Sequence, residues 1–191
     1  ITESHMDSCV NPYFCNRSNT NVNITSESGV PLGLFIREDG LKAYIAGNTS
    51  DKIFQYTLST AWDISSATFD NKSLDVSTNA EAPRGVSFKP DGEKMYVAGR
   101  SVSKITQYTL STPWDITTAS FDVDFNVSSE DGQINDLLIK PDDSKFYVPG
   151  GDTDTVYQYS MSTPWDLSTA SFDNKSFDVS SEADGTLGLF I

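Results

Sequence analysis

Few side chains in this 191-residue sequence could perform acid–base or nucleophilic chemistry. The single histidine, His5, lies in the amino-terminal tail, outside the repeats described below. A Ser-His-Asp relay needs a histidine beside the nucleophile, so that relay is not expected here. Aspartates are abundant, but most fall in turns or on the polar face of a strand, where they have structural roles. We therefore predict no catalytic residues, no cofactor and no enzymatic activity.

The two cysteines, Cys9 and Cys15, are separated by a short segment that contains an Asn-Pro pair, which is typical of a turn. This spacing predicts a small disulfide loop in the first 20 residues. Two free thiols are one alternative. A metal site that adds His5 and Asp7 is the other, but structural zinc needs four ligands at recognisable spacings, and these residues do not have them.

A second candidate for metal binding is Gly150–Asp154, whose sequence Gly-Gly-Asp-Thr-Asp resembles part of a calcium loop. The equivalent segments of the repeat described next, Asn48–Asp51 and Arg100–Ser103, do not share this pattern. We therefore expect a plain acidic loop, with calcium as the alternative, and predict no metal-binding residues.

The elements that position these residues follow from an internal repeat. Trp62, Trp114 and Trp165 are 52 and 51 residues apart, and each lies in a Ser-Thr-x-Trp-Asp phrase. The phrases Tyr-x-x-Gly, Gln-Tyr and Phe-Asp recur in the same phase. A fixed period near 50 residues indicates an array of one supersecondary unit. We expect the three tryptophans to be buried at equivalent places between units, rather than displayed for stacking on sugars.

Each unit is predicted to contain four strands. The first is apolar on both faces, as in Val86–Phe88, and is followed by a turn such as Pro90-Asp91-Gly92. The second carries the Tyr phrase, and the third alternates between apolar and polar residues. The fourth is clearest at Phe121–Val127, where Asp122, Asp124 and Asn126 share the polar face. Nothing in the sequence shows sustained helical periodicity.

The fourth strand is expected at the outer edge of its sheet, with Asn126 facing solvent. Copies one and three of this strand hold one extra residue, which predicts a bulge near Asn71-Lys72 and near Asn174-Lys175.

Four-stranded antiparallel units of 51–52 residues predict an all-β, β-propeller-type array. A parallel β-helix is the competing array, but its coils are shorter and lack these hairpins. We predict three complete blades with partial strands at each end. The segments are a non-repeat region at 1–20 and repeats at 21–76, 77–127, 128–179 and, in part, 180–191. Because a closed ring takes about 4–8 blades, we expect part of a larger propeller or chains that join head to tail.

The segment Pro83–Gly99 resembles the YVTN-type β-propeller repeat of bacterial and archaeal surface proteins and, more distantly, lactonase-like propellers. The Tyr-Thr-Leu-Ser-Thr-x-Trp-Asp phrase lies outside the general YVTN pattern and marks a subfamily. The resemblance implies a WD40-like repeat protein outside the cell or on its surface. In lactonase-like propellers several Asp, Asn and Glu side chains bind a metal at the mouth of the central channel, and only the third copy here offers such residues.

The channel mouth of a propeller lies near the start of the innermost strand. The residues predicted there differ between copies while their surroundings repeat, which makes Arg84, Asn135 and Asp136 the candidate ligand-binding residues.

The composition limits the partners. With 13 basic and 27 acidic residues, the net charge of −14 disfavours nucleic acid and anionic membranes, because both would repel the chain. No apolar run approaches the ~18 residues of a membrane span. Six sequons suggest attached glycans, at Asn16, Asn23, Asn48, Asn71, Asn126 and Asn174.

Together these features favour an extracellular or cell-surface glycoprotein with a structural or adhesive role, as a component of a surface layer, filament or fibre. Its partners would be other protein chains, including copies of itself, or glycans. The alternative is a propeller enzyme of the lactonase or hydrolase type with a metal at the channel mouth. A third reading is an intracellular interaction propeller, against which a Cys9–Cys15 disulfide or an attached glycan would argue.

Overall fold

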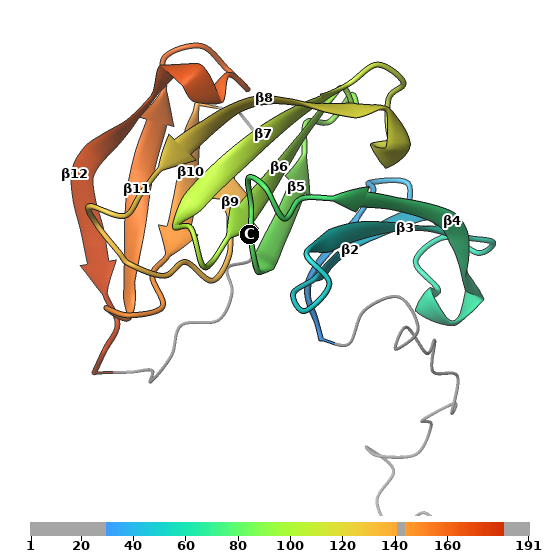
Figure 1. Ribbon diagram of the computed structural model, residues 1–191, viewed down its shortest axis with the longest axis horizontal. Coiled ribbons are helices and arrows are strands. Elements are labelled where there is room, and N and C mark those ends of the chain that lie inside the picture. Colours follow the sequence, from blue (N-terminus) through green and yellow to red (C-terminus); the bar gives the residue numbers. More distant parts are fainter. Residues whose placement is uncertain (1–29, 141–143, 182–191) are drawn as a thin grey trace, which may run out of the picture.

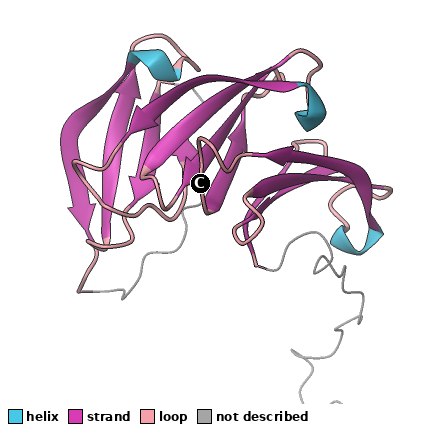
Figure 2. Cartoon of the chain, viewed as in Figure 1, coloured by secondary structure: helices cyan, strands magenta, loops and turns pink. Residues whose placement is uncertain are grey.

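The computed structural model describes residues 30–140 and 144–181, which form three four-stranded antiparallel sheets that follow one another along the chain (Figures 1 and 2). Blade 1 contains β1 (Pro31–Ile36), β2 (Lys42–Gly47), β3 (Lys52–Leu58) and β4 (Ala67–Asp75). Blade 2 contains β5 (Pro83–Phe88), β6 (Lys94–Gly99), β7 (Lys104–Leu110) and β8 (Ala119–Asn126). Blade 3 contains β9 (Leu138–Ile139), β10 (Lys145–Pro149), β11 (Thr155–Met161) and β12 (Ala170–Asp178).

Within each blade the strands are hydrogen-bonded in chain order, so the first and fourth strands form the two edges. The predicted all-β fold of four-stranded antiparallel blades is confirmed. The helical segments of the described residues are three single turns, η1 (Ile64–Ser66), η2 (Ile116–Thr118) and η3 (Leu167–Thr169), each between a third and a fourth strand. None of the described helices is long and apolar enough to cross a membrane.

The fourth strands carry the predicted irregularity. In β4 the pairing slips across Asp70 and Asn71, and Asn71 takes a positive φ of 56°. In β12 it slips in the same way across Asp173 and Asn174. The sequence reading missed a shorter slip in β8, where Gln107 pairs with Val123 and Tyr108 with Phe121.

The slip in β8 corrects the predicted alternation of that strand. Phe121 was expected on the apolar face, yet its side chain is 50% exposed because the residue after it bulges out of register. Beyond the slip the expected pattern holds: Val127 is buried and Asn126 is exposed, as predicted.

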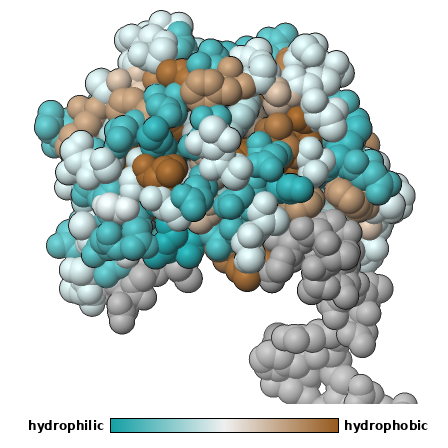
Figure 3. Space-filling view, viewed as in Figure 1, coloured by the Kyte–Doolittle hydropathy of each residue, from teal (hydrophilic) through white to brown (hydrophobic). Residues whose placement is uncertain are grey.

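Two of the three hydrophobic core clusters lie between blades, and the third lies within blade 1, where it includes Phe54, Tyr56 and Leu58. One cluster joins residues of blades 1 and 2, including Tyr44, Ile53, Phe88 and Ile116. A second joins blades 2 and 3, including Tyr96 and Leu167 among its members. A sheet covered on both faces needs strands that are apolar on both sides, which explains the weak polar alternation of the inner strands. On the outside, hydrophilic and hydrophobic residues are interspersed (Figure 3).

The Trp-Asp phrase forms a loop that reaches from one blade to the preceding one. Trp114 of blade 2 lies against Phe35 and Tyr44 of blade 1, with ring centroids 6.2 and 6.3 Å away. The Tyr44 hydroxyl donates to the Trp114 carbonyl oxygen at 2.8 Å. In the next copy the Tyr96 hydroxyl donates to the Trp165 carbonyl at 2.7 Å. The loop therefore connects adjacent blades through both its side chain and its backbone.

This arrangement corrects one prediction. Trp165 is buried at 8% exposure and Trp114 is partly buried, but Trp62 is 62% exposed. The indole of each loop covers the blade before its own, and the described residues contain no sheet before β1. The equivalence of the three phrases is therefore correct, whereas the burial of Trp62 was predicted wrongly.

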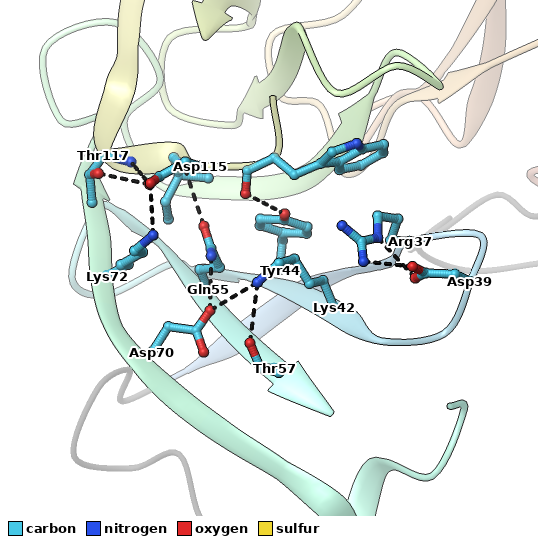
Figure 4. A network of polar contacts seen from close by, with 12 residues as sticks. Arg37, Asp39, Lys42, Tyr44, Gln55, Thr57, Asp70, Lys72, Asp115 and Thr117 are labelled. Carbon is cyan, nitrogen blue, oxygen red and sulfur yellow. Dashed lines mark hydrogen bonds and ion pairs between the residues drawn. The ribbon is translucent and has the colours of Figure 1, made fainter. Parts of the chain in front are cut away.

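A buried glutamine fixes the same junction (Figure 4). Gln55 donates from Nε2 to Asp70 at 2.8 Å, and its Oε1 accepts the backbone N–H of Ile116 in blade 2 at 3.2 Å. Gln107 repeats this arrangement, since it donates to Asp122 and accepts the N–H of Leu167 at 2.9 Å. Both glutamines are 1% exposed. The bulge in the fourth strand thus has a role, because it places the aspartate that orients the glutamine.

The aspartate of each phrase caps the single helical turn that follows. Asp115 Oδ1 accepts the N–H of Thr117 at 3.1 Å, while its Oδ2 pairs with Lys72 of blade 1 at 2.7 Å (Figure 4). The hydrogen bond from Lys72 is the main cause that holds the pKa of Asp115 below its ordinary value.

We predict that Gly92→Ala destabilises the protein more than Gly40→Ala. Both glycines have positive φ, 77° and 72°, and a Cβ at either would collide with the indole of its own blade, Trp114 or Trp62. The indole of Trp62 is exposed and can move aside, whereas that of Trp114 is held between blades. Each substitution should cost about 1 kcal/mol for the backbone, and Gly92→Ala about 1–2 kcal/mol more for the displaced packing. Urea unfolding measures both, and equal losses would contradict the prediction.

We also predict that Lys72→Met lowers stability by about 0.5–1 kcal/mol at neutral pH, since the ion pair is partly exposed. The pKa of Asp115 is lowered in the folded state, so the stabilisation is present above its unfolded pKa and is lost as the pH falls through the lowered value. The difference between the two proteins in urea unfolding should therefore shrink as the pH falls and disappear once Asp115 is protonated in both. A difference that is independent of pH would show that Lys72 acts through packing instead.

Candidate functional site

The starts of the inner strands approach one another closely because glycine stands there. A Cβ on Gly33 of β1 would collide with the carbonyl oxygen of Arg84 in β5. A Cβ on Gly85 would lie 2.6 Å from the Asp136 carboxylate, just before β9. In the third copy Asp136 itself stands where the first two copies have glycine. The side chains at these positions are therefore brought together at the inner edge of the blades.

The structure places the three predicted ligand-binding residues in this region. Asn135 is 4% exposed, and its Oδ1 accepts a hydrogen bond from Arg100 Nη1 at 2.7 Å. Asp136 is half-buried, and its Oδ1 accepts the N–H of Leu137 at 2.8 Å. Arg84 precedes the glycine that contacts Asp136. We refer to Arg84, Arg100, Asn135 and Asp136 as the inner-edge cluster.

Arg100 was missed by sequence reasoning. It follows β6, where the other copies have Asn48 and Gly151. The signal that singled out Arg84, a position that varies within a repeating context, was present here too. Arg100 could have been recognised from this signal only by knowing that the end of the second strand of one blade lies beside the start of the inner strand of the next blade.

The electrostatics of Arg84 are unusual for an arginine. Its Nε is buried and has no hydrogen-bond partner within residues 30–140 and 144–181. Burial lowers the pKa of the Arg84 guanidinium, and the positive charge of Arg100 lowers it further. By contrast, Arg37 pairs with Asp39 at 2.6 Å, which raises the pKa of the Arg37 guanidinium. Arg84 is thus a partly buried cation whose Nε has no partner among the described residues, and it is close enough to Arg100 to be affected by that second charge.

A groove of about 680 Å³ lies along the inner strands, and of the inner-edge cluster only Asp136 lines it. Its walls are largely apolar and come from all three blades, with Asp136 among the few polar groups. They include Phe35, Val86, Phe88, Leu137, Trp62, Trp114 and Trp165. The groove is large enough for a small organic molecule.

No group of three or more His, Cys, Asp or Glu side chains in the described part of the chain is arranged to hold a metal ion. The predicted acidic loop at Gly150–Asp154 is tied to the buried Asp131, which accepts hydrogen bonds from the N–H and the hydroxyl of Thr153 at 3.1 and 2.6 Å. Asp131 also accepts the N–H of Gln133 at 2.8 Å. These contacts give the segment a structural role.

The remaining predicted sites are on the outside or outside the described residues. Asn71, Asn126 and Asn174 are exposed on the fourth strands, and Asn48 is half-buried after β2. Asn16, Asn23, Cys9 and Cys15 lie outside the described residues, as do the partial strands expected at the two ends.

Comparison with known proteins supports the fold. No family model matches the sequence, and no curated protein matches it. Among solved structures, a candidate 6-phosphogluconolactonase from Bacteroides fragilis matches with a TM-score of 0.58 at 15% identity, over 78% of this chain and 39% of that one. The periplasmic gluconolactonase of Pseudomonas aeruginosa matches with a TM-score of 0.55 at 15% identity, over 78% and 41%. A protein of unknown function from Desulfotomaculum acetoxidans gives 0.55 at 18%, over 78% and 42%.

The fold is therefore that of a β-propeller of the kind seen in these lactonase-like proteins, and the three blades are consecutive units of it. The chain spans about two fifths of the length of the solved structures it matches. At these identities the likeness concerns the fold alone.

Proposed function

We propose that this propeller binds a small, hydroxylated organic anion, a carboxylate or a phosphate ester, at the inner-edge cluster. The observation that carries the proposal is the buried Nε of Arg84, which lacks a partner among the described residues, beside a second guanidinium. An anion between Arg84 and Arg100 would supply the missing acceptor and relieve the repulsion between the two cations.

The other groups of the cluster suit the rest of such a ligand. The planar guanidinium matches the two oxygens of a carboxylate or phosphate. Asp136 offers carboxylate oxygens to sugar hydroxyls, and the groove beyond it offers apolar walls. Two of the similar solved structures are named for gluconolactones, one of them phosphorylated, whose hydrolysis products are acids of this class.

Lactone hydrolysis, the alternative predicted from the sequence, is the second candidate function, and the lactonase-like neighbours favour it over the structural role. Asp136 is the one carboxylate of the inner-edge cluster and would serve as the general base that takes a proton from the attacking water. The chain covers only part of the length of these neighbours, so we propose lactone hydrolysis from the residues of the cluster and do not infer it from the neighbours.

The extracellular location, the YVTN-type subfamily and the structural or adhesive role are further proposals. The exposure of Asn71, Asn126 and Asn174 is compatible with glycans on the outer strands. Mass spectrometry of native material would test the extracellular location, because an intact Cys9–Cys15 disulfide or an attached glycan supports a secreted protein.

The binding proposal is tested by titrating the chain with 6-phosphogluconate, gluconate and, as the neutral control, glucose, using calorimetry or NMR. We expect the anions to bind and glucose not to bind. Arg84→Gln should weaken anion binding by about tenfold or more. Arg37→Gln, which removes an arginine already paired with Asp39, should leave it unchanged. Equal binding by both variants, or no binding of either anion at millimolar concentration, would overturn the proposal.

A further inference from the structure

One cross-strand pair in blade 3 departs from the repeat. In blades 1 and 2 a glycine of the first strand lies opposite an alanine of the second, Gly33 with Ala46 and Gly85 with Ala98. The register of β9 with β10 places Asp136 opposite Pro149 in blade 3. Both members of the pair thus differ in the copy that supplies Asn135 and Asp136 to the inner-edge cluster.

Pro149 shortens the pairing between β9 and β10. In an antiparallel ladder every second pair of opposite residues exchanges N–H···O bonds. The Lys140 N–H donates to the Lys145 carbonyl at 2.9 Å, and the same register makes residues 136 and 149 another pair of this kind. Proline has no N–H to donate. Accordingly β9 spans 2 residues whereas β5 spans 6, and residues 135–137 lie outside the strand.

The segment outside the strand carries polar groups of the inner-edge cluster. Asn135 accepts a hydrogen bond from Arg100 at 2.7 Å, and its own N–H donates to the Pro149 carbonyl at 3.0 Å. The Asp136 carboxylate reaches the start of β5, where Gly85 has no side chain to exclude it. Pro149 thus holds this segment through its carbonyl oxygen but offers no N–H to bring Asp136 into the ladder.

A proline at residue 149 is unfavourable for the sheet itself. Pro149 is buried, and β10 has a hydrogen-bonded strand on both sides. Proline is normally confined to edge strands and bulges, because it removes a hydrogen bond of the ladder. The other two copies keep the donor, since they have alanine there. A local departure that weakens one copy, directly beside a polar cluster, is typical of a functional site.

We propose that Pro149 is a positioning residue of the anion site, and that Asp136 selects hydroxylated anions over plain ones. By withholding an N–H, Pro149 keeps the start of β9 out of the ladder, so that the Asp136 carboxylate faces the ligand. A carboxylate accepts hydrogen bonds from hydroxyl groups but repels an anion that brings no donor. The site therefore suits sugar acids better than alkyl carboxylates. This inference rests on the proposed anion site at Arg84 and Arg100.

The test compares the binding of gluconate with that of hexanoate, a six-carbon carboxylate without hydroxyl groups, by calorimetry or NMR. The unaltered chain should prefer gluconate. Asp136→Gly and Pro149→Ala each give blade 3 the residue that the other copies have, so both variants suit the fold. Each should weaken gluconate binding by about tenfold. Neither should weaken hexanoate binding, because the arginines are unchanged.

The selectivity separates positioning from a general loss of stability, since a destabilised chain would lose affinity for both anions alike. The matched control is Pro164→Ala, which removes an exposed proline of the same blade where blade 1 has Ala61. It should leave both affinities unchanged. In Pro149→Ala the new amide at residue 149 should exchange with deuterium as slowly as that of Ala98, because it joins the ladder.

The outcomes distinguish this inference from the anion site itself. If the unaltered chain binds neither anion, both fail. If it binds both anions and Arg84→Gln weakens both, the anion site stands. In that case a chain without preference for gluconate, or a Pro149→Ala variant that keeps the full preference, overturns the roles given to Asp136 and Pro149. Rapid exchange of the new amide would also overturn the role of Pro149.

Discussion

The structure depends on the contact of two Trp-Asp loops, those of Trp114 and Trp165, with the blade before each of them. At this contact a buried glutamine must be satisfied at both of its ends, because an unpaired buried amide costs about 1–3 kcal/mol. The bulged aspartate of its own blade accepts from Nε2, and a backbone N–H of the next blade donates to Oε1. Neither blade can provide both partners alone, so a blade with this glutamine requires a neighbour.

This requirement sets the position of the inner strands as well. Two blades held at their loops bring the starts of β5 and β9 together, and the contact leaves room only for glycine at residue 85. The Nε of Arg84, in the residue just before this glycine, is buried, and burial lowers the pKa of the Arg84 guanidinium. The proposed ligand site is thus a product of blade packing, and it exists only where two different blades meet.

Much of the fold could be predicted from the sequence because the same pattern of strands and turns occurs in three copies. The spacing of Trp62, Trp114 and Trp165 gave the blades, and the extra residue near Asn71 gave a bulge. The exposure of Trp62 could not be predicted, since it depends on a neighbouring blade and not on the phrase itself. Arg100 was missed for a similar reason, because its partner Asn135 is 35 residues away and belongs to the next blade.

Hydrogen–deuterium exchange of the chain tests the central contact most directly, because three equivalent amides report on it. The N–H groups of Ile116 and Leu167 donate to the preceding blade, and that of Ile64 has no such acceptor among the described residues. We expect Ile116 and Leu167 to exchange slowly, at the rate of the blade cores, and Ile64 to exchange rapidly. Equal protection of all three amides would contradict the account, because the loop would then be stable without the blade that captures it.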